Sequence, residues 1–384
     1  MAAAASAPHP ALVAFARAYD EPFADALKFK RKGGRVVGYM SANAPVEVVE
    51  AAGMFPLRLD GGGLSETPRA DAFMERLFDP TVRGVCERLL SGELDFLDAL
   101  ILPRTTDSVQ RLYYYLCEQE RVGAAKLPKL ILYDLLHTPF YSSAEHNYAS
   151  LLRVRDALAA LAGKPVTDKA LAGAIAASNR RQAGLSVCLA AAQREPAGLT
   201  GQERLALIAA SQRMLADDFV AATAGLADAL QDRQVGRGPR IVIAGNGPDG
   251  GALHVAIEAL GCCIVGDFHD RGELSLGPPI DATLPPLRAI SDHYHRHTES
   301  ARRFPSRPDA VAAFAQRMSA DGVVFFFYAE EEVLTWDYPQ QRDALAVLGV
   351  PSICLAAQPY AVDAAAIEGA VSSLLATLKA EAHA

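Results

Sequence analysis

The sequence lacks the features that would place it in several large classes of protein. Its 384 residues include six cysteines, which form neither a CxxC pair nor a Cys/His spacing typical of zinc sites. No apolar run approaches the roughly 20 residues needed to span a bilayer. The net charge of −8 argues against a surface for nucleic acid or anionic membranes. We therefore expect a soluble, cytoplasmic protein in which the cysteines are buried free thiols.

The first residues also lack the pattern of a secretory signal. Residues 1–15 have no basic segment ahead of an apolar one, and Pro8 and Pro10 interrupt them. We expect a loose tail that leads into one helix within residues 1–30.

The length of the chain and the distribution of its apolar runs predict two α/β domains. Short apolar runs typical of buried parallel strands occur before and after a central block that is rich in Ala and Leu. The expected strands lie at residues 35–39, 54–59, 99–102, 129–134, 240–244, 262–265, 322–328 and 349–356. We predict a tail and helix at 1–30, a first α/β domain at 31–145, a helical domain or spacer at 146–235, and a second α/β domain at 236–384. The predicted fold class is α/β, with two parallel sheets joined by a helical segment.

A candidate functional loop lies within residues 98–116. A helix is expected at residues 70–97, and the strand at 99–102 is then ended by Pro103. Thr105 or Thr106 can cap the next helix, because each has a side-chain oxygen that can accept a hydrogen bond from a free helix amide. Ligands of open α/β sheets bind outside the carboxyl ends of the strands. We therefore expect residues 103–107 to face a ligand.

A second candidate loop follows the first predicted strand. Ser41 or Asn43 is expected to cap a short helix, with Pro45 in its first turn. Glu47 lies near the start of this helix, where the helix dipole favours a carboxylate. The residues alone allow a structural role as well as contact with a ligand for both Ser41 and Glu47.

Both loops resemble motifs of the 2-hydroxyacyl-CoA dehydratase family, which includes the substrate-binding subunits of ATP-dependent benzoyl-CoA reductase. The residues that fit the family pattern in the two loops are Ser41, Pro45, Glu47, Ala51, Ala52, Gly53, Pro56, Arg58, Leu59, Pro103, Thr105, Asp107, Arg111, Leu112 and Tyr113. Asn179 and the run Trp336 to Pro339 fit further motifs in the same order. The resemblance covers residues 35–358, and we expect two parallel-sheet domains of Rossmann or flavodoxin type.

The resemblance also draws attention to three positions that hold cluster-binding cysteines in family members. Thr106 stands at the first, Asp270 (or His269) at the second and Glu331 at the third. Hydroxyl and carboxylate oxygens do not replace soft thiolates on the iron of a 4Fe–4S cluster. We therefore expect this chain to hold neither a cluster nor another metal cofactor, and a cluster would belong to a partner subunit.

The resemblance implies roles for particular residues and partners. Ser41 and Glu47 would be catalytic, and Ser41, Thr106, Asp107 and Arg111 would contact substrate. The implied partners are an acyl-CoA substrate, a homologous subunit that carries the cluster and an ATP-dependent activator. The chain would then be a subunit of an acyl-CoA dehydratase, which is a lyase, or of a reductase. It would shape the acyl-CoA cleft or the partner interface.

Two functions of other classes remain open from the sequence. One is a non-redox acyl-CoA-binding or scaffold protein. The other is a repurposed enzyme that uses carboxylates, with a hard divalent metal held by Asp107, Asp267, Asp270 and Glu331 if their loops converge.

Two short motifs have simpler explanations than the sites they suggest. The sequence GNGPDGG at residues 245–251 fits the dinucleotide fingerprint, with Asp267 as a possible ribose partner, but Pro248 removes an amide donor. We expect a tight strand–helix turn there. His293, His295 and His297 alternate, so they would share one face of a strand and could bind a metal. The polar flanks instead favour a solvated loop or the start of a helix.

Overall fold

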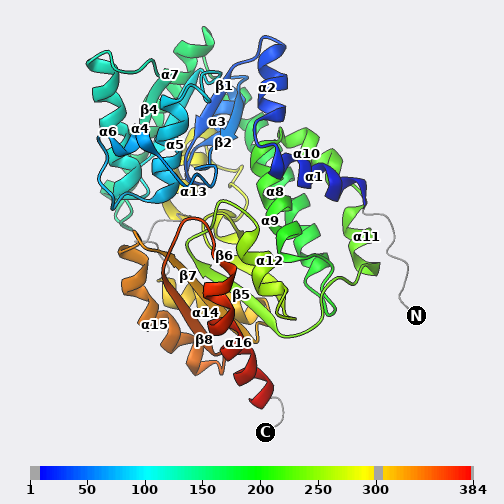
Figure 1. Cartoon of the computed structure of the whole chain (residues 1–384). Coiled ribbons are helices and arrows are strands. Elements are labelled where there is room, and N and C mark those ends of the chain that lie inside the picture. The colour runs from blue at the N-terminus through cyan, green and yellow to red at the C-terminus, as the bar shows by residue number, and fades with distance from the viewer. Residues whose placement is uncertain (1–8, 298–305, 382–384) are drawn as a thin grey trace.

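The computed structural model describes residues 9–297 and 306–381, which form two parallel sheets with helices around them (Figure 1). The tail expected at residues 1–8 lies outside the described residues. The first sheet contains β1 (Val36–Tyr39), β2 (Phe55–Arg58), β3 (Ala99–Pro103) and β4 (Lys129–Tyr133). The second contains β5 (Arg240–Gly245), β6 (Cys263–Phe268), β7 (Gly322–Tyr328) and β8 (Ser352–Gln358). Every strand pairing within the two sheets is parallel, so the predicted α/β fold with two parallel sheets is confirmed.

Helices cover both faces of the first sheet. One face packs against α3 (Val46–Ala51), α7 (Tyr141–Ala162), α8 (Asp168–Ala192) and α13 (Pro286–Arg296). The other packs against α2 (Ala24–Arg31), α4 (Pro68–Asp71), α5 (Pro80–Leu90) and α6 (Asp107–Arg121). Burial on both faces explains why the strand sequences are continuous apolar runs that show no alternation with polar residues.

The second sheet is covered in the same way. One face packs against α12 (Ala252–Glu258) and α16 (Ala364–Glu381). The other packs against α14 (Arg307–Arg317) and α15 (Val333–Val347). The 3₁₀ helix η1 (Glu273–Ser275) follows β6. In the described part of the chain, no helix combines the length and the apolar character needed to cross a membrane.

A helical block lies beside the two sheets. Its core joins α8 to α1 (Pro10–Asp20), α9 (Gly201–Arg213), α10 (Ala216–Thr223) and α11 (Leu226–Asp232). The helical segment predicted between the sheets is therefore present. The single helix expected within residues 1–30 is wrong, because this region forms α1 and α2. The helical structure expected at residues 70–97 is confined to α4, which ends at Asp71, and to α5, which starts at Pro80 with Asp79 as its cap.

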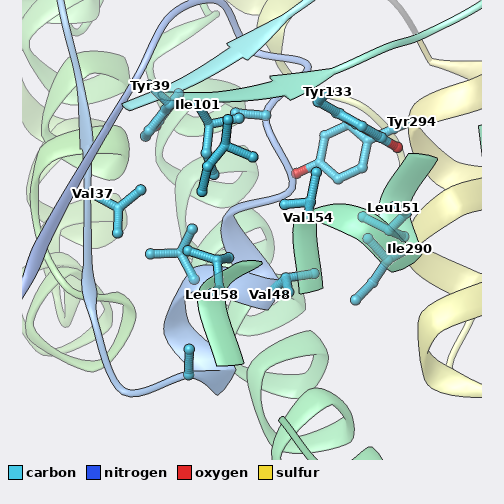
Figure 2. Close-up of a cluster of buried hydrophobic side chains, with 14 of the residues drawn as sticks. Val37, Tyr39, Val48, Ile101, Tyr133, Leu151, Val154, Leu158, Ile290 and Tyr294 are labelled. Atoms are coloured by element: carbon cyan, nitrogen blue, oxygen red, sulfur yellow. The ribbon is translucent and has the colours of Figure 1, made fainter. Parts of the chain in front are cut away.

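Helix α13 belongs to the second half of the sequence but packs into the core of the first sheet. Figure 2 shows Ile290 and Tyr294 of α13 among side chains such as Tyr133 of β4 and Leu151 of α7. The chain therefore enters the second domain at β5, returns to the first with α13, and then completes the second sheet. The two domains share one helix and are connected by more than a single linker.

The order of the strands marks where a ligand would bind. The orders are β2-β1-β3-β4 and β6-β5-β7-β8, so the direction of winding reverses between β1 and β3 and again between β5 and β7. Ligands of such sheets bind outside the carboxyl ends of the strands at the point of reversal. Residues from these ends contact one another across the two domains, as described below, and the candidate site therefore lies at this junction.

Two glycines in helices provide a matched test of the packing near this junction. A Cβ atom on Gly84 of α5 would overlap the backbone of Gly61 in the loop after β2, whereas a Cβ on Gly173 of α8 would meet nothing within 4 Å. We expect Gly84→Ala to lower the free energy of unfolding by about 1–3 kcal/mol, because the helix and the loop must separate. Gly173→Ala should raise it by about 0.5–1 kcal/mol through its lower backbone entropy cost.

Urea denaturation of both variants checks this prediction. A Gly84→Ala variant as stable as the unmodified chain would contradict the close contact between α5 and the loop after β2.

Candidate functional site

Buried ion pairs join the carboxyl ends of the two sheets. Arg58, the last residue of β2, donates to the backbone oxygen of Asp270 at 2.9 Å and to its carboxylate at 3.2 Å. Arg271 donates to the backbone oxygen of Leu59 at 3.1 Å. In the other direction, Gly61 donates its backbone N–H to the carboxylate of Asp249 at 2.8 Å. These contacts hold the loops after β2, β5 and β6 against one another.

The charges at this junction alternate in sign. Asp60 accepts hydrogen bonds from Arg213 at 2.5 Å and from Arg88 at 2.7 Å, and Arg271 pairs with Asp249 at 2.7 Å. Burial alone would raise the pKa of Asp60, but the nearby Arg213, Arg271 and Arg88 guanidiniums hold that pKa below its usual value. Asp270 has a lowered pKa for the same reason, because Arg271 and Arg58 outweigh its burial. Both carboxylates are therefore ionised at neutral pH.

The three positions that the resemblance matches to cluster cysteines each have a defined partner. Thr106 caps α6 by accepting a hydrogen bond from the N–H of Val109 at 3.3 Å. Asp270 pairs with Arg58 as described. Glu331 lies after β7 and accepts hydrogen bonds from the side chain of Asn246 at 2.9 Å and from the N–H of Leu334 at 2.8 Å. All three oxygen-bearing side chains follow carboxyl ends of strands.

Asp79 contacts the start of α6 next to Thr106 and lies near the charges of Asp270 and Glu331, and sequence reasoning missed it. Its N–H donates to Ser108 in the first turn of α6 at 3.3 Å, and its carboxylate caps α5 through the N–H of Val82 at 3.2 Å. Burial raises the pKa of Asp79 to about 7, with further contributions from the charges of Asp270, Asp249 and Glu331. The carboxylate thus lies within the electrostatic influence of the loops after β5, β6 and β7. A lone aspartate before a proline gives no sequence signal for this role.

The other residues predicted to contact substrate on α6 lie at the surface. Asp107 is exposed in the first turn. Arg111 pairs with Glu75 at 2.6 Å and stacks over the ring of Phe78 at 4.5 Å. Neither residue lines the cavity described next.

The predicted catalytic residue Glu47 lines a cavity of about 100 Å³ between α3, α8 and α13. Glu47 is buried, and its two carboxylate oxygens accept hydrogen bonds from Ser178 at 2.7 Å and from Tyr294 at 2.9 Å. Burial raises the pKa of Tyr294 well above its usual value and lowers that of His293. The cavity offers hydroxyl and carboxylate groups around one end.

A second buried pair forms part of the wall of this cavity. Arg181 of α8 pairs with Glu50 of α3 at 3.0 Å and lines the cavity itself. Tyr39 of β1 also lines it, and burial raises the pKa of Tyr39 to about 12. The tyrosine is therefore a neutral hydroxyl at physiological pH, able to donate or accept a hydrogen bond.

Ser41 lies beside this cavity in a strained backbone conformation. Its φ of 63° is in the left-handed region that favours glycine, and its hydroxyl accepts from the N–H of Asn43 at 3.4 Å. The expectation that Ser41 or Asn43 caps α3 is wrong, because the cap residue is Pro45 and makes no side-chain hydrogen bond. Strained residues occur at sites where the surrounding structure fixes them for a function.

The other candidate sites suggested by the sequence are not assembled. Asp267 is completely buried and bonded to His254 and His269, so it can neither contact a ribose nor join Asp107, Asp270 and Glu331 in a carboxylate site. Among the described residues, these carboxylates form no group with metal-binding geometry. His293 and His295 lie at the end of α13 and not on a solvated loop, and His295 is buried beside Asn147.

Five of the six cysteines lie in helices or strands, and Cys262 directly precedes β6. Cys86, Cys188, Cys262 and Cys263 are buried, Cys117 and Cys354 are half-buried, and all six are free thiols. Burial raises the pKa of the Cys86 and Cys262 thiols to about 12. These thiols stay protonated at neutral pH, whereas an iron ligand must be a thiolate.

The raised pKa of Asp79 predicts a pH dependence of stability. A proton bound more tightly in the folded state than in the unfolded state stabilises the fold at low pH, and this contribution is lost as pH rises through about 7. Asp79→Asn keeps the helix cap and removes the titration. From pH 5 to pH 8, we expect the free energy of unfolding of this variant to rise relative to the unmodified chain by on the order of 2 kcal/mol.

Urea denaturation between pH 5 and pH 8 measures the difference. Asp168→Asn, at an exposed position in the first turn of α8, is the control. Parallel stability curves for Asp79→Asn and the unmodified chain would show that Asp79 does not titrate in this range.

The comparisons with known proteins cover most of the chain. The family model of the 2-hydroxyglutaryl-CoA dehydratase D-component matches residues 41–375. A benzoyl-CoA reductase subunit from Thauera aromatica is 24% identical over 311 residues, which cover 76% of this chain and 77% of that protein. The beta subunit of (R)-2-hydroxyglutaryl-CoA dehydratase from Acidaminococcus fermentans is 21% identical over 339 residues, with coverages of 85% and 88%. The (R)-phenyllactyl-CoA dehydratase beta subunit of Clostridium sporogenes is 21% identical over 336 residues, with coverages of 85% and 87%.

The family model therefore spans the strands β2 to β8, the helices α8 to α11 of the helical block and both candidate loops. This match confirms the family indicated by the sequence motifs, and the chain belongs to the 2-hydroxyglutaryl-CoA dehydratase D-component family.

Proposed function

We propose that this chain is a subunit of a 2-hydroxyacyl-CoA dehydratase or benzoyl-CoA reductase-like enzyme that holds no 4Fe–4S cluster itself. It would shape the acyl-CoA cleft or the interface with a homologous, cluster-bearing subunit. The relatives support a place in such a complex, because their names describe them as subunits of a reductase and of dehydratases. An ATP-dependent activator would act on the partner subunit.

The observation that carries the proposal is the ion pair between Arg58 and Asp270. A thiolate ligand would have to be free to bind iron, but Asp270 is held by Arg58 and has Arg271 beside it. Thr106 and Glu331 are likewise used as a helix cap and as a hydrogen-bond acceptor. Oxygen donors at all three positions do not fit a cubane cluster, which proteins hold through thiolates.

The protonated thiols support the same conclusion. Cys86 and Cys188 lie in the middle of helices, and Cys262 and Cys263 lie at the start of β6. Each is packed in an apolar core, where a thiolate is unfavourable.

The cavity beside Glu47 supports a role in binding the acyl part of the substrate. It gathers a buried carboxylate and several hydroxyls in one place, and a few such polar groups are what orient a ligand in a pocket. A carboxylate held between two hydroxyls, as Glu47 is between Ser178 and Tyr294, can accept or return a proton through either of them. In this proposal Glu47 is the proton-transfer residue, and the strained Ser41 at the rim faces the thioester.

The iron content of the purified chain tests the absence of a cluster. After anaerobic reconstitution with iron and sulfide, we expect fewer than about 0.1 iron atoms per chain, since no set of thiolates is available to bind a cubane. Co-expression with a cysteine-bearing homologue should give a brown complex that contains both chains. A cluster on the isolated chain would overturn the proposal, and a colourless chain that binds acyl-CoA but no homologue would favour the non-redox binding protein.

A substitution at Glu47 tests the role of the cavity. In the assembled complex, Glu47→Gln should lower kcat by about 10²-fold or more with a much smaller change in KM, because a proton acceptor is lost while the shape is kept. Glu145→Gln is the matched control, since Glu145 pairs with Arg288 on a partly exposed part of α7. Equal kcat values for the two variants would remove Glu47 from the chemistry.

A further inference from the structure

A second cluster of chemically active side chains lies inside the second domain, outside the site described above. His254 of α12 and His269, directly after β6, both place Nε2 against one carboxylate oxygen of Asp267, at 2.6 Å and 3.1 Å. All three side chains are completely buried. The proposed function uses none of them.

The hydrogen bonds within this cluster leave three buried atoms without partners. They are Oδ2 of Asp267 and the Nδ1 atoms of His254 and His269. With neutral imidazoles, both Nε2 atoms donate to the same oxygen and both Nδ1 atoms are acceptors that receive no donor. Buried polar atoms are almost always satisfied, so three unpaired atoms in one cluster call for an explanation.

The donor atoms have the arrangement of metal ligands. One ligand atom from each of the three residues can be chosen so that all three lie within 4.8 Å of one another. Zinc binds imidazole nitrogen at about 2.0–2.1 Å and carboxylate oxygen at about 2.0–2.2 Å, so its ligand atoms lie roughly 3.3 Å apart in a tetrahedral site. The two Nε2–Oδ1 distances, 2.6 Å and 3.1 Å, would therefore have to lengthen only slightly to admit an ion. The two rings stand at 83° to each other, which lets both nitrogens face one point.

The backbone around the cluster is shaped to hold the two rings. A Cβ atom on Gly247 would lie 2.7 Å from Nδ1 of His269, and one on Gly201 would lie 2.9 Å from Cδ2 of His254. The glycine-rich loop after β5 and the start of α9 can therefore pack directly against the imidazoles. This packing gives a physical reason for Gly247 in the GNGPDGG sequence that does not involve a nucleotide.

A further hydrogen bond fixes the backbone of Asp267. The N–H of Asp267 donates to Glu273 at 2.8 Å, and Glu273 pairs with the buried Arg204 of α9. Asp267 and His269 are two residues apart, so they point to the same side of the extended chain, toward α12. The three side chains are thus positioned by β6, α12 and α9 together.

We propose that His254, Asp267 and His269 bind one divalent metal ion of the zinc type. Two imidazoles and a carboxylate form the donor set that proteins use for Zn²⁺. The ion can also recruit the unpaired Oδ2 of Asp267. Because the site is closed to solvent, the role is structural: the ion ties α12 to the end of β6. Asp270 follows His269 directly, so the ion also steadies the segment that pairs with Arg58.

Refolding with and without zinc tests this proposal on the unmodified chain. The chain is unfolded in denaturant that contains a chelator and is then refolded with or without Zn²⁺. After desalting, the bound metal and the Tm of each sample are measured. We expect about one zinc per chain and a Tm several degrees higher in the zinc sample, since an ion that binds only the folded state stabilises it. Less than about 0.1 equivalent of zinc with an unchanged Tm would overturn the proposal.

Variants locate the ion. His254→Gln and His269→Gln should each lower bound zinc at least tenfold, whereas His295→Gln, another buried histidine, should retain it. Replacement of the bound zinc by Co²⁺ provides a second measurement, because the visible absorption spectrum of Co²⁺ depends on its ligands. This spectrum should differ between His269→Gln and the unmodified chain. Retention of zinc by both site variants, or its loss from His295→Gln alone, would place the ion elsewhere and overturn the proposal. The refolding result for the unmodified chain stands even if a variant does not fold.

Discussion

The pairing of Arg58 with Asp270 determines how the rest of the candidate site is arranged. The guanidinium is almost completely buried, with 3% of the side chain exposed, and such a charge is stable in the interior only with a partner. That partner comes from the other domain, so the two sheets must meet at their carboxyl ends for the fold to satisfy Arg58. Asp60, Asp249 and Arg271 extend the same pattern across the junction. Folding and formation of the site are therefore linked by one set of charges.

The proposed function amounts to a change of chemistry within the architecture of the family. The three positions that would hold sulfur ligands of iron hold oxygen-bearing side chains in this chain. These oxygens accept hydrogen bonds from a helix amide, a guanidinium and an amide side chain. Each of these oxygen-bearing side chains has a hydrogen-bond partner close by. Such partners distinguish an adapted site from a damaged one. The cavity beside Glu47 lies apart from these positions, in the part of the structure where α3, α8 and α13 meet. In the proposed function, substrate binding is therefore kept in this chain and redox chemistry is held by a partner subunit.

Much of the fold was predictable from the sequence because buried parallel strands have a local signal. The run at residues 322–328 is uniformly apolar, and β7 has the predicted bounds. The parts that could not be predicted depend on contacts distant in sequence. Nothing local in α13 indicates that Ile290 and Tyr294 pack against the first sheet. Likewise, Asp79 and Asp270 have no common motif, and only the folded chain brings their charges together.

The candidate site residues divide in the same way, into those with a local sequence signal and those without one. Glu47 and Ser41 were found through a motif, and the structure adds their surroundings: a cavity for one and a strained backbone for the other. His254 was not found, and His269 was named only as an alternative to Asp270. The spacing of the two histidines resembles no short metal-binding pattern, and the link between them runs through Asp267. Sites built within one strand–helix turn can be read from sequence, whereas sites built between elements require coordinates.

The path of the chain through α13 restricts how the protein can move and evolve. A two-domain enzyme with one linker can open like a hinge, but here a helix from the second half is embedded in the core of the first. Tyr294 on that helix also bonds Glu47 in the cavity, so any large separation of the domains would pull a wall away from the pocket. Neither half can be recombined as an independent unit. A fragment that ended before α13 would leave apolar side chains of the first core exposed. The two halves therefore depend on being inherited as one chain.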